Sequence, residues 1–463
     1  MFKGNTFYLV VITLIAATGG FLFGFDMAVI SGALTFVQTQ FDLSAAQEGW
    51  FVSSALIGCI LGVAISGEYS DRLGRRFAMM TAAMLFFLSA IGTATAPSFT
   101  LLITARLLGG IAVGIASNVV PLYISEIAPP NIRGRLVTCY QLAITVGILF
   151  AYISNYIVLN FSEATDSGTL WTFLEFIFIE EVWRGMFGIE TIPALLFLLG
   201  IFMIPESPRW LYNQNRGNEG QAILERILGR EKADEIADEV GKTLQEEEGS
   251  YKELLKPGLR KALIIGILLP VFSQFSGINA IIYYGPRILN EAGVELNSAL
   301  ISQILLGFAN MLFTFIAVWK VDTLGRRPLY LFGTAGATIS LIATGYFFFI
   351  GATGSIFLLF SVIAFLACFA FSIGPLKFVV ASEIFPNKIR GRALALSVMA
   401  MWIADTVVGQ LTPMLLSYGG AAVTFWFFAI FCVFSFWFIY KMVPETKNKS
   451  LEEIQQLWRI EQT

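Results

Sequence analysis

Long apolar segments separated by short polar ones dominate this chain. Each segment holds about 20 residues, the length that an α-helix needs to cross the hydrocarbon core of a bilayer. The first part of the chain contains six of them, at 7–32, 50–68, 77–95, 100–122, 138–160 and 186–204. The last part contains six more, at 261–289, 299–319, 329–350, 356–381, 394–417 and 422–443. The pattern predicts an all-α polytopic membrane protein with twelve transmembrane helices.

A polar stretch at 207–258 interrupts the apolar pattern. Within it, Ile223, Ile227 and Ile236 recur among charged residues at loosely helical spacing. This spacing predicts short amphipathic helices lying in water, with a disordered charged linker as the alternative. The predicted organisation is an N-terminal six-helix half at 1–206, a cytoplasmic helical linker at 207–258, a C-terminal six-helix half at 259–443 and a cytoplasmic tail at 444–463.

Three pairs of short motifs recur in the same order in the two halves, each after the corresponding span. The pairs are Asp71-Arg-Leu-Gly-Arg-Arg76 with Asp322-Thr-Leu-Gly-Arg-Arg327, Glu126-Ile-Ala-Pro-Pro-Asn-Ile-Arg-Gly-Arg135 with Glu383-Ile-Phe-Pro-Asn-Lys-Ile-Arg-Gly-Arg392, and Pro205-Glu-Ser-Pro-Arg209 with Pro444-Glu-Thr-Lys447. The halves are therefore predicted to be parallel repeats related by an axis along the membrane normal. Such repeats place a solute site near the midplane between them.

Lysine and arginine concentrate in the loops that follow the even-numbered spans, in the linker and in the tail. The opposite loops hold mainly acids, Glu48 among them, and only two basic residues, Arg184 and Arg287. Because positively charged loops stay on the cytoplasmic side, both termini and the linker are predicted to be cytoplasmic.

The repeated motifs join acids and arginines at helix ends, which suggests a latch. Bidentate pairs between arginine and carboxylate would hold the cytoplasmic side closed. The predicted latch acids are Asp71, Glu126, Glu206, Asp322, Glu383 and Glu445, and the predicted latch arginines are Arg76, Arg133, Arg327 and Arg390. The alternative is that these arginines only set the topology; the duplicated acids favour the latch.

Composition excludes several classes of protein. Of the 463 residues, 56% are hydrophobic and only 14% are charged, and a net charge of −3 gives no reason to expect a nucleic-acid partner. The chain has no histidine, which removes zinc-site and His-triad enzymes and leaves any proton relay to carboxylates. The four cysteines lie in apolar stretches without metal-ligand spacing and are interpreted as packing residues. We expect no enzyme activity, no metal and no cofactor.

Asp26 and Arg106 are the deep ionisable residues of the first half. Asp26 lies within the apolar, glycine-rich stretch 19–32. A charge at the bilayer centre costs about 2.5–3.5 kcal/mol on insertion scales, so an isolated one is unfavourable. Together the two side chains can pair.

Amide and hydroxyl side chains cluster in the predicted spans, and such groups suit bidentate hydrogen bonding to sugars. Asn279 and Tyr283 are four residues apart and share a helical face, and Gly277 would let that helix break. Helix–helix hydrogen bonding is the usual role of an isolated amide in a span, but the cluster favours solute contact. Its remaining members are Gln141, Gln274 and Asn310.

Taken over its whole length, the chain resembles the sugar porter family of the major facilitator superfamily, which includes bacterial proton-coupled xylose and hexose symporters and animal glucose facilitators. One Asp-x-Leu-Gly-Arg-Arg motif marks only the superfamily. More specific motifs, in order, are Pro205-Glu-Ser-Pro-Arg-Trp-Leu211, Gln274-Phe-Ser-Gly-Ile-Asn279 and Pro444-Glu-Thr-Lys447. The resemblance implies the major facilitator fold.

The resemblance also implies roles for single residues. It makes Asp26 the proton-coupling acid, paired with Arg106, because an aspartate here accompanies symport in similar proteins. It places Tyr283 and Tyr284 near the external gate. Its implied sugar contacts are Gln141, Gln274, Asn279, Asn310, Phe378 and Trp402.

Several positions depart from the family pattern. Sugar porters usually have two glutamines where this chain has Ser273-Gln274, a tryptophan at Phe378, and a glutamine or asparagine at Met401. Lys377 and Asp405 are additional charges inside predicted spans. Three roles are open for these two charges: pairing with each other, contact with the solute, and snorkelling or helix packing. An unpaired Lys377 would suit an anionic sugar such as a uronate.

The predicted function is proton-coupled monosaccharide symport by alternating access, with sugar, proton and the lipid bilayer as partners. The alternatives are a proton-independent uniporter, a transporter of a polyol or sugar acid, and, in another class, a sugar-sensing receptor. We expect a monomer in a bacterial inner membrane.

Overall fold

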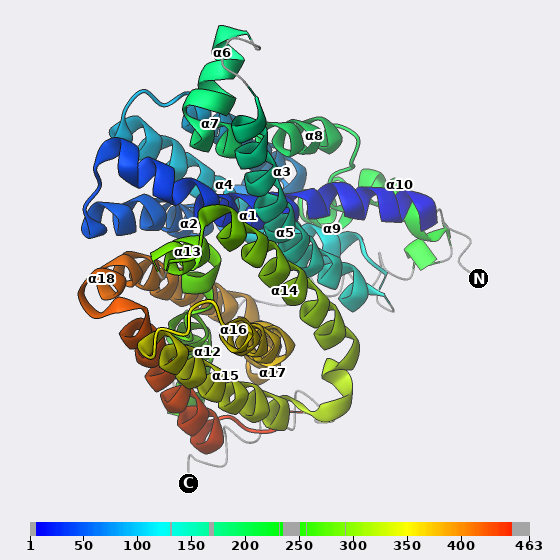
Figure 1. The fold of residues 1–463 in the computed structure, drawn as a ribbon. Helices are drawn as coiled ribbons and strands as arrows, with labels where there is room; N and C mark the ends of the chain where they lie inside the picture. The colour runs from blue at the N-terminus through cyan, green and yellow to red at the C-terminus, as the bar shows by residue number, and fades with distance from the viewer. Residues whose placement is uncertain are drawn as a thin grey trace. The chain divides into compact units, whose positions relative to one another are not determined.

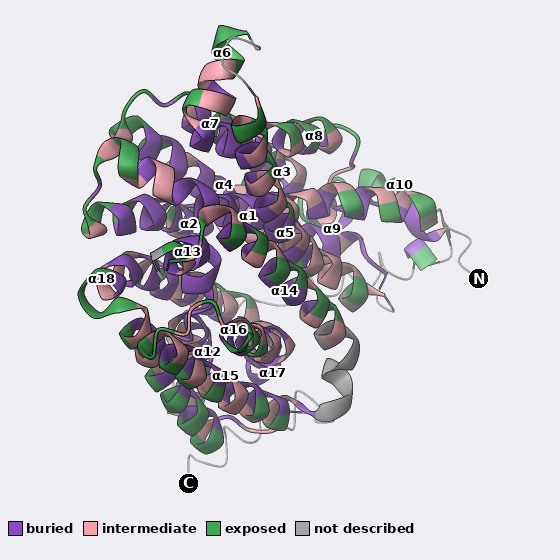
Figure 2. Ribbon diagram, in the orientation of Figure 1, coloured by how far each residue is buried: buried purple, intermediate pink, exposed green. Residues whose placement is uncertain are grey.

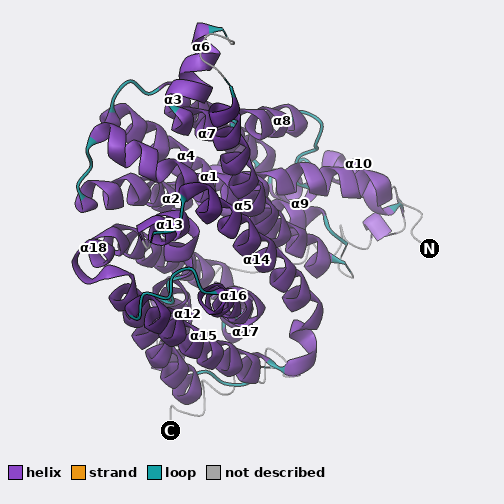
Figure 3. Ribbon diagram, in the orientation of Figure 1, coloured by secondary structure: helices purple, strands orange, loops and turns teal. Residues whose placement is uncertain are grey.

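The computed structural model describes residues 6–129, 132–165, 171–230, 232–234, 251–255, 257–291 and 293–446. All regular secondary structure in these residues is helical (Figure 3). The predictions for most of the linker after residue 234 and for the tail after residue 446 lie outside the described residues. The chain divides into two compact units, one comprising 1–29, 57–154 and 164–247 and the other 30–56, 155–163 and 248–463.

The first unit is built from helices of the first half of the sequence. Its helices, some of which extend into the second unit, are α1 (Thr6–Phe41), α2 (Ala45–Leu73), α3 (Arg75–Thr95), α4 (Phe99–Ile127), α5 (Arg133–Ala164), α6 (Thr172–Glu175), α7 (Val182–Gly188), α8 (Thr191–Ile201), α9 (Pro208–Asn213) and α10 (Gly217–Leu228). A π-helical segment, Phe176–Glu180, links α6 to α7.

Within the first unit, α3 packs along α4, and α2 approaches α4 closely (Figure 1). A Cβ atom built on Gly114 would lie 2.8 Å from the Cα atom of Gly62. No larger residue fits at that crossing, which is how small residues let membrane helices approach. The amphipathic α10 packs on α9 and buries Leu224, Ile227 and Leu228.

The second unit contains the second half of the sequence together with 30–56 and 155–163. Its own helices are α12 (Pro257–Phe275), α13 (Ile278–Glu291), α14 (Leu296–Leu324), α15 (Arg326–Phe349), α16 (Ile356–Cys368), α17 (Gly374–Ile384) and α18 (Asn387–Met442). A short 3-10 turn, Tyr251–Leu255, precedes α12, and a π-helical segment, Phe369–Ile373, joins α16 to α17. Helix α18 packs against α12 and α15 (Figure 1).

Eleven helices among the described residues are long and apolar enough to cross a membrane. The last of these segments, Ile389–Met442, has 54 residues, about 80 Å of helix at ~1.5 Å per residue, against a hydrocarbon core of about 30 Å. Gly420 interrupts it with a positive φ of 72°, so it comprises two spans joined at a kink. The fold is that of an all-helical polytopic membrane protein, as predicted.

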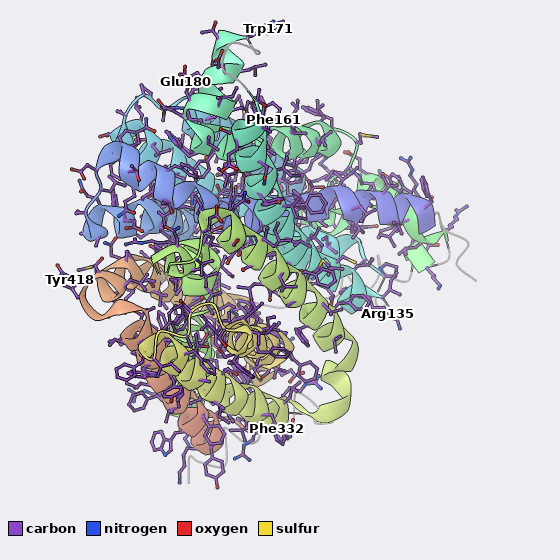
Figure 4. The ribbon with its side chains drawn as sticks, viewed as in Figure 1. Arg135, Phe161, Trp171, Glu180, Phe332 and Tyr418 are labelled. Atoms are coloured by element: carbon purple, nitrogen blue, oxygen red, sulfur yellow. The ribbon has the colours of Figure 1, made fainter. Side chains whose placement is uncertain are left out.

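Apolar side chains also cover the outer surfaces of the helices, which suits a surface in contact with lipid rather than water. Exposed residues lie along the length of α15 (Figure 2), and Phe332 on that helix is 76% exposed. Tyr418, at the kink of α18, is 87% exposed; both side chains project outward in Figure 4.

Glycine and proline decide where spans break. The seventh span breaks between α12 and α13 at Gly277, which has a φ of +86°, as the sequence predicted. The sixth span has a two-residue turn between α7 and α8, just before Pro193; this turn contains Glu190, and its backbone angles stay helical. The breaks matter because they bring polar side chains into the interior of their unit.

Candidate functional site

Asp26 on α1 and Arg106 on α4 form a buried ion pair in the first unit. Arg106 Nη1 donates to Asp26 Oδ1 at 2.7 Å and to the Asp26 backbone oxygen at 3.2 Å. The two residues are 2% and 1% exposed. Gly109, one turn after Arg106, lets α3 approach beside the pair, because a Cβ there would lie 2.5 Å from Ser89 Oγ.

This ion pair uses only part of each group. Asp26 Oδ2 and Arg106 Nε have no hydrogen-bond partner among the described residues. A buried charge with an unused polar atom carries a desolvation penalty that one contact only partly offsets. The pair therefore has capacity for a proton on the carboxyl and for a second partner at the guanidinium.

Glu190 is a third ionisable group at this site, and it is not among the residues predicted from the sequence. It is 2% exposed, and its carboxyl interacts electrostatically with both Asp26 and Arg106. Its Oε1 atom has no hydrogen-bond partner among the described residues. The same signal that identified Asp26, a carboxylate inside a predicted span, was present at Glu190.

A second buried polar cluster lies in the second unit and centres on Asp405 of α18. Asn279 Nδ2 donates to Asp405 Oδ1 at 2.6 Å and to Gln274 Oε1 at 2.9 Å. The Tyr283 hydroxyl donates to Asp405 Oδ2 at 3.2 Å. The break at Gly277 lies between Gln274, at the end of α12, and Asn279, at the start of α13, and the Asn279 amide bridges Gln274 and the Asp405 carboxylate.

Lys377 lies beside this cluster without touching Asp405. Its Nζ donates to Ser273 Oγ at 3.1 Å and lies 5.2 Å from the centre of the Phe378 ring. The charges of Lys377 and Asp405 interact through space, but in the described part of the chain the two side chains form no direct ion pair. Lys377 is 7% exposed, so it does not snorkel to the surface.

The other predicted sugar contacts lie at different depths. Asn310, Met401 and Trp402 are buried in the second unit, and Phe378 is half-buried. Gln141 is exposed on α5. An apolar cavity of about 310 Å³ lies elsewhere in the second unit, among α13, α14, α15, α16 and α18, and its described lining carries no charged side chain.

The tyrosines predicted near the external gate both contact α18. Tyr283 donates to Asp405, and the buried Tyr284 donates to the backbone oxygen of Gly409 at 2.7 Å. One helical turn of α18 therefore receives both hydroxyls.

Glu48 on α2 and Arg287 on α13 form a buried ion pair in the second unit. Glu48 is 0% exposed and Arg287 is 5% exposed, although the sequence suggested that both are loop charges. Close by on α2, Ser53 donates to Gln410 Oε1 at 2.8 Å, and Gln410 Nε2 donates to the Ala46 backbone oxygen at 2.9 Å. These contacts tie the start of α2 to α13 and α18.

Arg184, the other basic residue of the predicted external loops, is also buried and paired. Its Nη1 donates to the backbone oxygens of Ala94 and Ala96, and its Nε donates to Glu181 at 2.7 Å. Its guanidinium lies 4.3 Å from the ring centre of Trp183. This arginine closes the end of α3 and contributes to packing.

The repeated motif of the first unit forms a compact network around Arg75. Arg75 donates to Glu126 at 3.1 Å and to Asp71 at 2.7 Å. The Glu206 carboxylate accepts the backbone N–H groups of Arg75 and Arg76. Burial raises the pKa of the Glu206 carboxyl, against the lowering effect of these N–H donors.

The second unit repeats the same network with its own residues. Arg326 donates to Glu383 at 3.0 Å, and Glu445 accepts the backbone N–H groups of Arg326 and Arg327. Thr446 adds a hydroxyl to Glu383 at 2.5 Å. The repeat detected in the sequence is therefore a repeat of contacts.

In both motifs the first arginine pairs with a carboxylate, and the second binds backbone carbonyls. Arg76 donates to the oxygens of Ile201 and Phe202, and Arg327 donates to that of Tyr440. Arg390 donates to the Phe385 oxygen, and Arg133 is exposed. The side chain of Asp322 is outside the described residues. Each described ion pair of this network lies within one unit.

Comparison with known proteins shows a family model, curated relatives and solved structures that are similar to this chain. Residues 12–458 match the family model described as "Sugar (and other) transporter". The arabinose-proton symporter of Bacillus subtilis is 41% identical, with 97% of this chain and 95% of that protein covered. The D-xylose-proton symporter of Escherichia coli is 38% identical, with 99% and 97% covered. A solved structure of the E. coli xylose transporter XylE in an inward-open conformation superposes with a TM-score of 0.84 at 36% identity, covering 97% of this chain and all of that one.

Proposed function

We propose that this chain, which belongs to the sugar transporter family of the major facilitator superfamily, carries a pentose across the membrane together with a proton. The protein is a multi-pass membrane transporter that couples sugar to protons, and it is not an enzyme. The pentose is supported by two relatives named for arabinose and xylose, each matched over nearly its full length.

The buried Asp26–Arg106 pair is the observation that carries the proton part of the proposal. With Glu190, the site holds two carboxyls and one guanidinium, so the fully ionised group has one net negative charge. One proton makes it neutral and removes the cost of burying that charge. Protonation of Asp26 also removes its attraction for Arg106, which can then turn toward Glu190. In this proposal one proton accompanies each sugar.

The sugar part of the proposal rests on the polar cluster of the second unit. Gln274 and Asn279 offer amide donors and acceptors, and Phe378 and Trp402 offer aromatic faces for the C–H side of the sugar ring. In this proposal Asn310, which belongs to the same unit, adds hydrogen bonds. Movement between outward- and inward-facing states then delivers sugar and proton to the cytoplasm.

Uptake of labelled pentoses into proteoliposomes, with and without an imposed proton gradient, tests the proposal. The wild type should accumulate sugar only with the gradient. Asp26→Asn should abolish accumulation yet retain exchange of sugar across the membrane, because the carboxyl that carries the proton is gone. Asp42→Asn is the matched control: this aspartate is exposed, follows α1, and has a φ of 50° that asparagine tolerates.

Two outcomes would contradict the proposal. Equal accumulation by Asp26→Asn and the wild type would place the coupling proton elsewhere. Equilibration without accumulation in the wild type would indicate a uniporter.

Orientation and assembly form the remaining part of the proposal. Both termini and the linker face the cytoplasm of a bacterial cell, the protein resides in the inner membrane, and it acts as a monomer. Labelling of single cysteines placed at the two termini from either side of the membrane checks the orientation.

A further inference from the structure

We infer that Asp405 is a positioning residue for sugar selectivity: its carboxylate fixes which way the amides of Asn279 and Gln274 point. This inference rests on the proposed function, since it assigns which groups of the proposed sugar site donate hydrogen bonds and which accept them.

The chemistry of a carboxylate fixes the first step. An ionised carboxylate only accepts hydrogen bonds, so the group of Asn279 that faces Asp405 at 2.6 Å must be the NH2 and not the carbonyl. A neutral partner at position 405 would impose no such choice, because an amide both donates and accepts.

The orientation then passes to Gln274. Asn279 Nδ2 has two hydrogens, and the structure uses them on Asp405 and on Gln274 Oε1. The acceptor side of Gln274 is thereby engaged, and its NH2 group remains as the donor. Asn279 presents its carbonyl oxygen as an acceptor. A sugar at this cluster therefore meets a donor from Gln274 and an acceptor from Asn279, in a fixed order.

Lys377 supplies the counter-charge without competing for the carboxylate. Both Asp405 oxygens are engaged, one by Asn279 and the other by Tyr283. Ser273 holds the Lys377 ammonium, which acts on Asp405 through space. The two buried charges balance, so a neutral sugar suits the cluster better than a uronate, whose carboxylate Asp405 would repel.

The test compares transport of D-xylose with that of its three single-hydroxyl epimers, D-ribose, D-lyxose and L-arabinose, in proteoliposomes under a proton gradient. Asp405→Asn allows the Asn279 amide to turn over, so the spread of kcat/KM across the four sugars should narrow by about two- to tenfold, the value of one exchanged hydrogen bond. A merely structural role for Asp405 would lower all four rates together and leave the spread unchanged.

Two further variants keep the test decisive. Asp405→Asn with Lys377→Met removes both buried charges and avoids an uncompensated ammonium; it should show the same narrowing even where the single variant folds poorly. Thr406→Val is the matched control, because in the described part of the chain this hydroxyl on the same helix donates to the backbone oxygen of Trp402. The control should retain the wild-type spread.

The outcomes separate the inference from the proposed function. If uptake continues and the spread is unchanged in both Asp405 variants, the inference is wrong and the proposed function stands. If the wild type transports none of the pentoses but accumulates glucose or galactose, the proposed pentose is wrong. The inference is then decided by the ratio of kcat/KM for these two epimers, compared between the wild type and the Asp405 variants. If the wild type transports no sugar of either set, both fail.

Discussion

At the scale of single residues, buried charge organises this protein. Asp26, Arg106 and Glu190 share the interior of the first unit, and Lys377 and Asp405 share that of the second. Burying a charge in the membrane interior costs free energy, so each of these groups is expected to have a partner or a function. The first group carries an odd number of charges and suits proton exchange; the second balances and suits positioning.

Glu190 gives a prediction at this scale. Glu190→Gln removes the negative charge that acts on Asp26 and Arg106, so Asp26 alone holds the guanidinium and releases it less readily. Proton-driven uptake should therefore require a more acidic external medium than in the wild type. The measurement is the initial uptake rate against external pH.

Glu181→Gln is a suitable control for Glu190→Gln, since Glu181 pairs with Arg184 away from Asp26. An unchanged pH profile for Glu190→Gln would mean that Glu190 takes no part in the proton site.

At the scale of helices and their connections, the repeated motifs anchor the helix ends of each unit. Arg75 and Arg326 occupy equivalent places, each paired with the glutamate of the next motif in its unit. The two ion pairs are not equally buried: the side chains of Arg75 and Glu126 are 7% and 5% exposed, whereas those of Arg326 and Glu383 are 15% and 24% exposed. A buried pair is damaged more when one partner is removed, because the other charge is left uncompensated.

Arg75→Gln should accordingly lower stability by about 3–5 kcal/mol, the cost of breaking a buried ion pair. Arg326→Gln should cost less, because solvent reaches its partner. Thermal unfolding in detergent measures both. The adjacent Arg76→Gln is the control, since among the described residues its guanidinium donates to the backbone carbonyls of Ile201 and Phe202. A larger loss for Arg76→Gln than for Arg75→Gln would contradict this ranking.

At the scale of the whole molecule, the ion pair of Glu48 with Arg287 links a helix from the first half of the sequence to one from the second. Ser53 and Gln410 add a hydrogen bond between the same parts of the chain. A transport step that moves α2 away from α13 must break these contacts. The contacts therefore stabilise the conformation in which α2 and α13 lie together.

A double-mutant cycle tests this link. Glu48→Gln and Arg287→Gln should each lower the unfolding temperature, and the double variant should lose less than the sum, with a coupling of about 0.5–3 kcal/mol. Both single variants should also increase labelling of a cysteine placed at Trp50, which is 39% exposed. If the losses in stability are additive and the labelling is unchanged, the pair does not restrain the movement of α2 relative to α13.

Sequence reasoning reached the fold and part of the site. Asp26 and Arg106 were identifiable because a charge inside an apolar span is costly wherever it lies along the helix. Gly277 was identifiable as a break because its left-handed φ suits glycine. The repeat was identifiable because its motifs keep their order.

Other assignments depended on how the helices turn about their axes. The sequence could not show that Arg75 rather than Arg76 meets Glu126, since adjacent residues of a helix point about 100° apart and packing decides which one faces inward. It could not show that Glu48 and Arg287 meet, because they lie far apart along the chain and look like loop charges.

The sequence by itself predicted a membrane protein with twelve spans, motifs repeated in order in its two halves and a costly carboxylate in its first span, since hydrophobic length and charge burial are local properties. Only the tertiary structure decided which partners those charges have. Glu190, at a turn in the sixth span, interacts electrostatically with Asp26, and Asn279, just after the break in the seventh span, donates to Asp405. The physical reason is that hydrogen bonds act over about 3 Å, a distance that helix packing sets and a one-dimensional pattern does not.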